Sequence, residues 1–253
     1  MSTEVKTAVG RFVWHDHISD DPDKARDFYT KLFGWDIEVF KPGEMDYPMI
    51  LVDGQGHGGF GTAEGAPPHW VGHIYVDDVD AAAQRTEGAG GTVVVAPTDI
   101  PDVGRFSVLR DPQGAVFSVF ASNDPNASQS EGVFVWDELV TSDVEDAKRF
   151  YGEVVGWTTR DQQVGGDFTY TLFRSGDTDR AGCMPMMPDT PAPMWTAYVG
   201  TEDVDGTAER AKELGATVYA GPMDIPDGIG RFAVIGDPTG AVVGLFKPGG
   251  GGS

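Results

Sequence analysis

Residues 12–35 read FVWHDHISDDPDKARDFYTKLFGW, and residues 134–157 read FVWDELVTSDVEDAKRFYGEVVGW. The two stretches align without a gap and share their first three residues, an internal FY pair and the closing GW. A second pair, residues 76–120 and 201–246, aligns through the shared segments DVD, DIPD, GRF and DP-x-GAV. Self-similarity of this kind is the signature of a repeated structural unit. The chain therefore contains two homologous modules in tandem.

The repeat also sets the expected boundaries of the modules. We predict a first module at residues 1–121 and a second at residues 133–248. The linker, residues 122–132, lies in the stretch ASNDPNASQSEG, which is polar and rich in turn-forming residues. Residues 249–253 are glycine and serine, which predicts a flexible tail outside the fold.

Each module is predicted to contain two β-α-β-β-β units. In the first unit a strand at residues 12–18 leads to a helix, with Asp21 as its N-cap, Pro22 in its first turn and Gly34 at its end. One face of this helix is apolar and is formed by Ala25, Phe28, Tyr29 and Leu32. The remaining strands of the module are expected at residues 37–40, 48–52, 58–61, 70–76, 92–95, 106–109 and 115–120, with a second helix that starts at Val79. The predicted fold class is α+β, in which curved mixed sheets form two cups covered outside by helices.

Composition narrows the range of partners. The net charge of -22 arises from 40 acidic and 18 basic residues, and such a chain repels nucleic acid and anionic lipid. Cys183 is the one cysteine, so an intramolecular disulfide and a cysteine-rich zinc site are excluded. No run approaches the roughly 20 apolar residues that span a bilayer. We expect a cytoplasmic protein, a monomer or homodimer, whose partner is a hydrophobic small molecule rather than nucleic acid or a membrane.

Several motifs carry a family resemblance. The helix DFYTKLFGW, the segment VDDVDAA, the turn DPQGA and the doubled strand-and-helix order resemble the vicinal oxygen chelate superfamily. This superfamily groups glyoxalase I, bleomycin-resistance proteins, fosfomycin-resistance enzymes and extradiol dioxygenases. The W-x-[DE] start and the DIPDVGRF run are similar to two-module actinobacterial glyoxalase-like proteins. The resemblance implies the fold but leaves the reaction open, because one fold hosts many chemistries.

The resemblance also implies where metal ligands would lie. Metal-dependent members take them from the first strand, from the start of the fifth strand and from the last strand of a module. The matching residues here are Trp14, Val71 and Ser118 in the first module, and Trp136, Thr196 and Gly244 in the second. None is a usual ligand of a divalent metal. We therefore expect no cofactor, and a metal only if this strand alignment is wrong. The predicted ligand-binding residues are Trp14, Trp136, Val71, Thr196 and Ser118.

The pattern HDH at residues 15–17 contains three potential metal ligands, but strand alternation places them on two different faces of the strand. Successive side chains of a strand point to opposite faces, so Phe12 and Trp14 are expected to share the cup face with Asp16. His15 and His17 then face the helices, where we expect them to be semi-buried and satisfied by local hydrogen bonds.

Two pairs of polar residues remain as candidate catalytic groups. Asp16 and its counterpart Glu138 would each project a carboxylate into an aromatic cup, where burial raises the pKa unless a partner stabilises the charge. The alternative is a structural ion pair with Arg105 or Arg231. His73 shares the cup face and has Tyr198 as its counterpart; this pair could act as base and acid, or could be wall residues.

Four tryptophans also recur in matched pairs and suit either ligand stacking or core packing, namely Trp14, Trp136, Trp70 and Trp195.

These residues support two main functional hypotheses. The first is a metal-independent enzyme that performs acid-base chemistry, of lyase or isomerase type, on an apolar carbonyl or polyketide-like compound. The second is a protein that sequesters such a compound without reaction, as bleomycin-resistance relatives do. A metal-dependent glyoxalase or dioxygenase is a third hypothesis, against which the predicted ligand positions argue.

Overall fold

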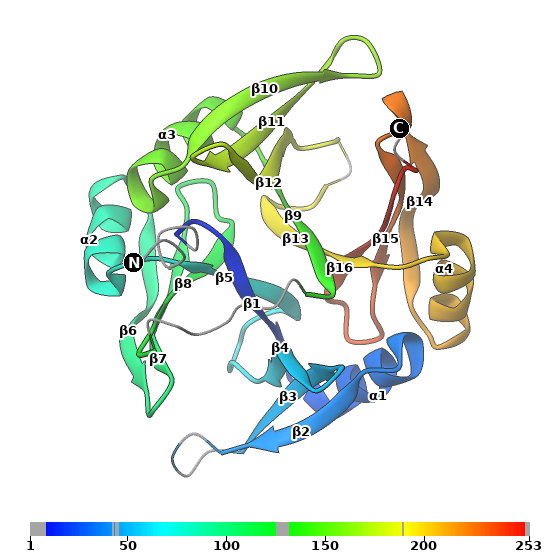
Figure 1. Ribbon diagram of the computed structural model, residues 1–253, viewed down its shortest axis with the longest axis horizontal. Coiled ribbons are helices and arrows are strands. Elements are labelled where there is room, and N and C mark those ends of the chain that lie inside the picture. The colour runs from blue at the N-terminus through cyan, green and yellow to red at the C-terminus, as the bar shows by residue number, and fades with distance from the viewer. Residues whose placement is uncertain (1–8, 42, 44–45, 125–131, 189, 251–253) are drawn as a thin grey trace, which may run out of the picture.

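The computed structural model describes residues 9–41, 43, 46–124, 132–188 and 190–250 (Figure 1). Most of the predicted linker and residues 251–253 of the predicted tail lie outside these residues. The first module contains β1 (Phe12–Ile18), α1 (Pro22–Phe33), β2 (Asp36–Phe40), β3 (Tyr47–Val52), β4 (Gln55–Gly61), β5 (His69–Tyr75), α2 (Val79–Gly88), β6 (Thr92–Ile100), β7 (Gly104–Arg110) and β8 (Val116–Ser122). The second contains β9 (Phe134–Thr141), α3 (Val144–Val155), β10 (Thr158–Val164), β11 (Phe168–Ser175), β12 (Thr178–Pro185), β13 (Met194–Gly200), α4 (Val204–Glu213), β14 (Thr217–Ile225), the 3-10 turn η2 (Pro226–Gly228), β15 (Gly230–Gly236) and β16 (Val242–Pro248).

Each module forms one curled sheet of eight strands. The strand order is β2-β3-β4-β1-β5-β8-β7-β6 in the first and β10-β11-β12-β9-β13-β16-β15-β14 in the second. β1 runs parallel to β4 and antiparallel to β5, which in turn runs parallel to β8, so the sheet is mixed. The predicted α+β class, with two tandem modules of β-α-β-β-β units, is confirmed.

The helices begin and end where local chemistry dictates. The side chain of Asp21 accepts a hydrogen bond from the backbone N–H of Lys24, and Pro22 occupies the first helical position. Gly34 ends α1 with φ of 73°, a left-handed conformation that glycine adopts at little cost. α3 repeats this arrangement with Asp143 as N-cap and Gly156 at its end.

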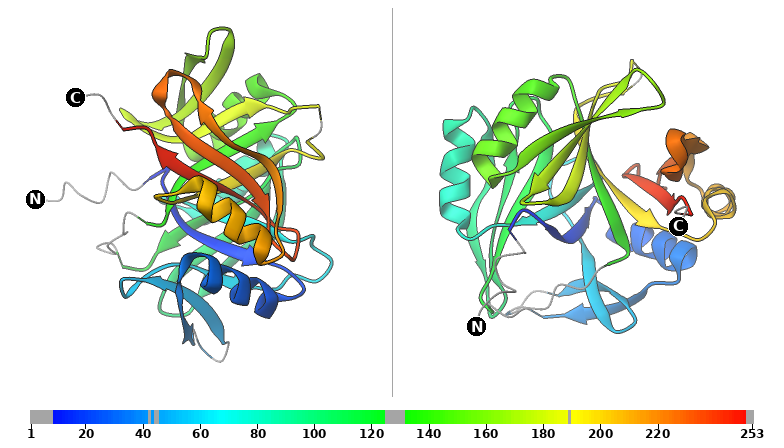
Figure 2. Two further views of the ribbon diagram at one scale, coloured as in Figure 1. Left: turned by 90° about the vertical axis from the view of Figure 1, so that its right-hand side faces the viewer. Right: turned by 45° about the horizontal axis from the view of Figure 1, so that its top comes forward.

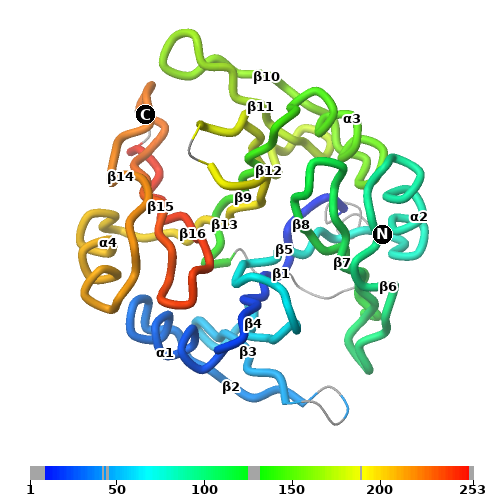
Figure 3. Tube along the Cα trace, turned by 180° about the vertical axis from the view of Figure 1, so that it is seen from behind, coloured from blue at the N-terminus to red at the C-terminus, as the bar shows by residue number. Residues whose placement is uncertain are grey.

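Two hydrophobic cores lie between the modules. In one core, α2 and the strands around β8 pack against α3 and β11 to β13. In the other, α1 and β4 pack with α4, β15 and β16. Figures 1, 2 and 3 show α1 beside α4 and α2 beside α3 from each direction. Each core is therefore shared by a unit of one module and a unit of the other.

The two histidines of β1 contribute to this contact between modules. Nε2 of His15 lies 2.8 Å from Oδ1 of Asp137 on β9, and Nε2 of His17 lies 2.8 Å from Oδ2 of Asp237. His17 is fully buried, and His15 is 4% exposed. The expectation that both face away from the cup agrees with this placement, but the prediction of semi-buried side chains with local bonds is wrong. Their partners come from the other module, which the local sequence does not reveal.

Strand alternation fails at the start of β1. The pairing of β1 with β5 shifts register between Phe12 and Trp14, which marks a bulge. The ring of Phe12 lies 5.9 Å from that of His15 and 5.2 Å from that of Trp195, so it faces the interior between the modules. The prediction that Phe12 shares the cup face with Trp14 is therefore wrong, because the bulge adds a residue that alternation does not count.

No helix of the described residues has the length and apolar character needed to cross a membrane.

Candidate active site in two cups

The concave face of each sheet forms a cup. Cup one is lined by Trp14, Asp16, Tyr47, Val71 and His73 with apolar side chains of β6 to β8, and cup two by Trp136, Glu138, Tyr170, Thr196 and Tyr198 with apolar side chains of β14 to β16. The neighbours of Asp16 and Glu138 along their strands point toward the other module, as His15 and His17 do. Asp16 and Glu138 therefore point away from the other module, and the two cups open away from each other. The hollow that these residues of both modules line has a volume of about 3120 Å³. A typical small-molecule site has roughly 300–1,000 Å³, so each cup has room for a polycyclic ligand.

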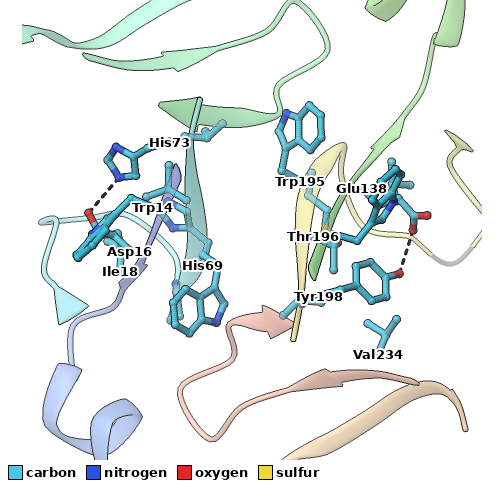
Figure 4. A pocket seen from close by; sticks show the side chains of 18 of the residues that line it. Trp14, Asp16, Ile18, His69, His73, Glu138, Trp195, Thr196, Tyr198 and Val234 are labelled. Carbon is cyan, nitrogen blue, oxygen red and sulfur yellow. Dashed lines mark hydrogen bonds and ion pairs between the residues drawn. The ribbon is translucent and has the colours of Figure 1, made fainter. Parts of the chain in front are cut away.

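The pairing of β1 with β5 brings the candidate residues of cup one together. Trp14 lies opposite His73, and Asp16 lies opposite Val71. Nε2 of His73 lies 3.1 Å from Oδ2 of Asp16 (Figure 4). Oδ1 of Asp16 accepts a hydrogen bond from the hydroxyl of Tyr47 and one of 3.1 Å from the indole N–H of Trp14. The indole also contacts the Tyr47 oxygen at 2.7 Å, so four side chains form one network.

This network decides the charge of Asp16. Burial acts to raise its pKa, but the hydrogen bond and the charge of His73, together with the bonds from Tyr47 and Trp14, lower it below its ordinary value. The side chain of Asp16 is 18% exposed and that of His73 is 8% exposed, so both reach the hollow. Asp16 is therefore a carboxylate that holds an imidazole, rather than an acid with a raised pKa.

Cup two repeats the geometry with different chemistry. Oε1 of Glu138 accepts a hydrogen bond of 3.0 Å from Tyr198, and Oε2 accepts one of 2.8 Å from Tyr170 (Figure 4). The indole N–H of Trp136 donates to the Tyr170 oxygen at 3.0 Å. Burial raises the pKa of Glu138 above its ordinary value, although the two tyrosine bonds act to lower it. The carboxyl group therefore has phenols as partners where Asp16 has an imidazole.

Two tyrosines of these networks were not predicted from the sequence. Tyr47 on β3 and Tyr170 on β11 take matching places in the two cups. Burial raises the pKa of both phenols well above 10, so both stay protonated and act as donors. Alignment of residues 47–54 with residues 170–177 places the two tyrosines together and is the signal that could have found them.

The positions predicted to line the cups differ in whether their side chains reach the hollow. Val71 and Thr196 line the hollow and are 4% exposed. Ser118 is fully buried, and its hydroxyl donates to the carbonyl of Ser107 at 3.0 Å, so it supports the sheet. A Cβ atom at Gly244 would lie 2.1 Å from Cδ1 of Tyr198, which shows that the tyrosine ring rests on this glycine.

The arginines considered as partners of the cup carboxylates bind elsewhere. Arg105 pairs with Asp80 and Asp99 at 2.7 and 2.6 Å. Arg231 pairs in the same way with acidic residues of α4 and β14, at 2.6 and 2.8 Å from Asp205 and Asp224. The structural ion pair of Asp16 or Glu138 with an arginine is therefore a wrong prediction, because β7 and β15 hold both arginines against acids on the helix and on the neighbouring strand.

The tryptophans divide between core and cup. The indole N–H of Trp70 donates to Tyr29 at 2.9 Å, and that of Trp195 donates to Tyr151 at 2.8 Å. Both side chains are less than a tenth exposed and belong to the two cores, as the core-packing alternative predicts. Trp14 and Trp136 instead line the cups and donate to the tyrosines of the networks described above.

Comparison with known families agrees with this architecture. Residues 14–119 and 134–245 match the model of the glyoxalase/bleomycin resistance protein/dioxygenase superfamily. The chain belongs to this superfamily. Among relatives, it is 37% identical over 246 residues to the protein named "Putative glyoxylase CFP32" of Mycobacterium tuberculosis, covering 93% of this chain and 94% of that one. It is 33% identical over 255 residues to the anthracycline biosynthesis protein DnrV of Streptomyces peucetius, covering 92% of each.

Solved structures of the superfamily share the fold at low sequence identity. The Mn(II)-bound glyoxalase of Novosphingobium aromaticivorans superposes with a TM-score of 0.64 at 21% identity, covering 94% of this chain and 82% of that one. The 2,2',3-trihydroxybiphenyl 1,2-dioxygenase of Sphingomonas wittichii superposes with a TM-score of 0.66 at 15% identity. This superposition covers 95% of this chain and 91% of that one. At these identities the likeness concerns the fold alone.

The superfamily includes metal-bound members, so we compared the donor atoms of this chain with what a divalent ion requires. Among the described residues, no three His, Cys, Asp or Glu side chains come together in a group that could hold a metal. In cup one, Asp16 and His73 already bond each other, and in cup two both oxygens of Glu138 accept from tyrosines. The donor sets of both cups therefore do not fit a divalent ion.

Proposed function

We propose that cup one binds an apolar carbonyl compound of polyketide type and transfers a proton on it without a metal ion. The observation that carries this proposal is the contact between His73 and Asp16 in a cup whose walls are mostly apolar. A buried imidazole with a carboxylate partner is a common arrangement for a general base.

The geometry assigns a role to each group. The carboxylate of Asp16 accepts a hydrogen bond from Nε2 of His73, which leaves the lone pair of a neutral imidazole on Nδ1. Nδ1 can take a proton from the carbon next to the substrate carbonyl, and the electron pair of the broken C–H bond then forms an enolate. Return of the proton to that carbon completes an exchange, and its delivery to the γ-carbon of a conjugated enolate completes an isomerisation. Tyr47 and Trp14 hold Asp16 in place through their bonds to Oδ1.

The proposed class of substrate has separate support. The walls of the cup are mostly aromatic and aliphatic, which suits a flat apolar molecule. One relative is named for anthracycline biosynthesis, and anthracyclines are polycyclic carbonyl compounds. Asp16 and His73 are too few donors for a divalent ion, which favours proton transfer over chemistry that depends on a metal.

A suitable experiment measures the exchange of an acidic C–H proton for deuterium. We would incubate the protein with 2-tetralone in D₂O and measure loss of the α-proton signal by NMR. His73→Gln is expected to lower the exchange rate by roughly 100-fold or more, because general-base catalysis contributes about 10²–10⁴. Glu138→Gln changes the matching carboxyl group of cup two and is expected to leave exchange unchanged.

Binding is measured separately through quenching of tryptophan fluorescence by 1,4-dihydroxyanthraquinone. Wild-type protein that binds this probe but does not accelerate exchange would refute catalysis and favour the sequestration hypothesis. A His73→Gln variant that exchanges at the wild-type rate would refute the assignment of the base.

A further inference from the structure

Cup two differs from cup one in its charged groups. Cup one is lined by His69, His73 and Arg110 as well as by acids. Among the described residues of the second module that line cup two, none is lysine, arginine or histidine. The charged side chains among these lining residues are therefore all acids.

Among the described residues, Glu138 is the acid lining cup two for which the structure shows no cationic partner. The acids Asp179 and Asp224 also line this cup, but arginines pair with each of them at 3.1 Å or less. Glu138 accepts two hydrogen bonds from phenols, which satisfy its oxygens without neutralising its charge. Its side chain is partly exposed to the hollow, so a ligand can reach it.

Aromatic rings surround this carboxyl group. Trp136, Tyr170 and Tyr198 form the network at the floor. At the mouth, Phe168 is 38% exposed and Tyr219 is 60% exposed, and both line the hollow. The faces of aromatic rings attract cations, and a protein places several rings around a cation when it recognises one.

We propose that cup two is a binding site for an organic cation, in which a protonated amine on an aromatic or apolar body approaches Glu138. The rings of the cup contact the body and the ammonium group, and the carboxylate of Glu138 balances the charge. This ligand class does not depend on the proton transfer proposed for cup one. An anionic ligand is disfavoured in cup two, because no described cationic side chain that lines it offsets repulsion by the Glu138 carboxylate.

Burial raises the pKa of Glu138, so this carboxyl group can bind a ligand in either of two ways. A cation favours the ionised carboxylate and restores its charge, whereas a neutral ligand would accept a hydrogen bond from the protonated acid. The comparison of a cation with a neutral molecule of the same shape distinguishes these two ways.

The test uses three probes that share a naphthalene ring. These are 2-naphthylmethylamine, which is protonated at neutral pH, 2-naphthylmethanol and 2-naphthoate, and their affinities are measured by calorimetry on the full chain. We expect the amine to bind at least about 10-fold more tightly than the alcohol, as for a charged hydrogen bond in a partly buried site, and the naphthoate to bind most weakly. Equal binding of the amine and the alcohol would overturn the proposal.

Two variants with matched positions locate the effect. Glu138→Gln is expected to remove the preference for the amine while the affinity for the alcohol changes less than about twofold. Asp16→Asn alters the counterpart in cup one and should keep the preference. Loss of the preference in Asp16→Asn, or its retention in Glu138→Gln, would place the cation site elsewhere.

A measurement on the wild type does not depend on how well the variants fold. In a ¹⁵N-labelled sample, addition of the amine should shift the indole N–H signal of Trp136, which lies in the Glu138 network. The corresponding signal of Trp14 in cup one should stay in place. A shift of Trp14 without a shift of Trp136 would contradict the assignment to cup two.

Discussion

Asp16 and Glu138 occupy matching positions on β1 and β9, yet their pKa values shift in opposite directions, because the partners of Asp16 outweigh the effect of burial and the two tyrosines that bond Glu138 do not. The difference comes from one pair of residues on the adjacent strand, His73 in the first module and Tyr198 in the second. An imidazole can carry a positive charge and stabilise a carboxylate, whereas a phenol offers a hydrogen bond and no charge. The partner on this adjacent strand thus contributes to the different chemistry of the two cups.

The raised pKa of Glu138 has a consequence for stability. Folding favours the neutral acid, and this contribution is fully present below the ordinary value of 4.5 and is lost as the pH rises through the raised pKa of the folded state. Glutamine cannot ionise. The free energy of unfolding of Glu138→Gln relative to wild type is therefore expected to increase as the pH rises from 4.5 towards neutrality. Urea unfolding followed by tryptophan fluorescence at several pH values measures this difference.

A control at an exposed acid separates this effect from a general change of charge. Glu145 on α3 pairs with Lys148 and its side chain is 81% exposed. Glu145→Gln should differ from wild type by less than about 1 kcal/mol at every pH, as is usual for surface ion pairs. If the difference between Glu138→Gln and wild type does not change with pH, the carboxyl group is not held in its neutral form.

At the scale of single elements, the sequence predicted what depends on local chemistry. The helix of residues 22–33 was predicted from its cap, its apolar face and Gly34, and the strands from their alternation with turns. The error at Phe12 arises from a bulge, which is a property of strand pairing and leaves no mark in β1 itself. The contact of His73 with Asp16 joins two strands that are far apart in the chain, so the sequence could place both residues in the cup but could not pair them.

The contact between β13 and β16 gives a prediction at this scale. Tyr198 lies opposite Gly244, and a Cβ atom at Gly244 would lie 2.1 Å from the tyrosine ring. Gly244→Ala must therefore displace the ring and weaken its bond to Glu138. We expect a loss of about 1–3 kcal/mol in the free energy of unfolding, which is typical of overpacking, and weaker binding of the naphthyl probes.

The matching position in the first module supplies the control for this variant. Ser118 lies opposite His73 and already carries a Cβ atom, so Ser118→Ala removes only the hydroxyl that bonds Ser107. Its expected cost is about 1 kcal/mol, the usual contribution of one hydrogen bond. If Gly244→Ala unfolds at the same urea concentration as wild type, the close approach of Tyr198 to β16 does not require glycine.

For the whole molecule, the repeat in the sequence and the packing in space divide the chain differently. The sequence divides it into a first and a second module, each with its own sheet. The two cores group the β-α-β-β-β units differently. The first unit of the first module packs with the second unit of the second module, and the second unit of the first module packs with the first unit of the second module. The buried pairs of His15 with Asp137 and of His17 with Asp237 reinforce this division. The cups are thus formed within modules, whereas the helices that support them pack between modules.

This arrangement predicts that neither module is stable by itself. Production of residues 1–124 alone would expose the apolar faces of α1 and α2 that α4 and α3 cover in the full chain, and would leave His15 and His17 without their carboxylate partners. Each Å² of apolar surface that becomes exposed costs about 25 cal/mol, whereas a whole domain is usually stable by only about 5–15 kcal/mol. We expect the fragment to lack fixed tertiary structure or to self-associate, and to form a one-to-one complex when mixed with residues 132–253. Near-ultraviolet circular dichroism and light scattering after gel filtration report these states, and a monomeric fragment with the tertiary signal of a folded protein would show that the shared cores are not required for folding.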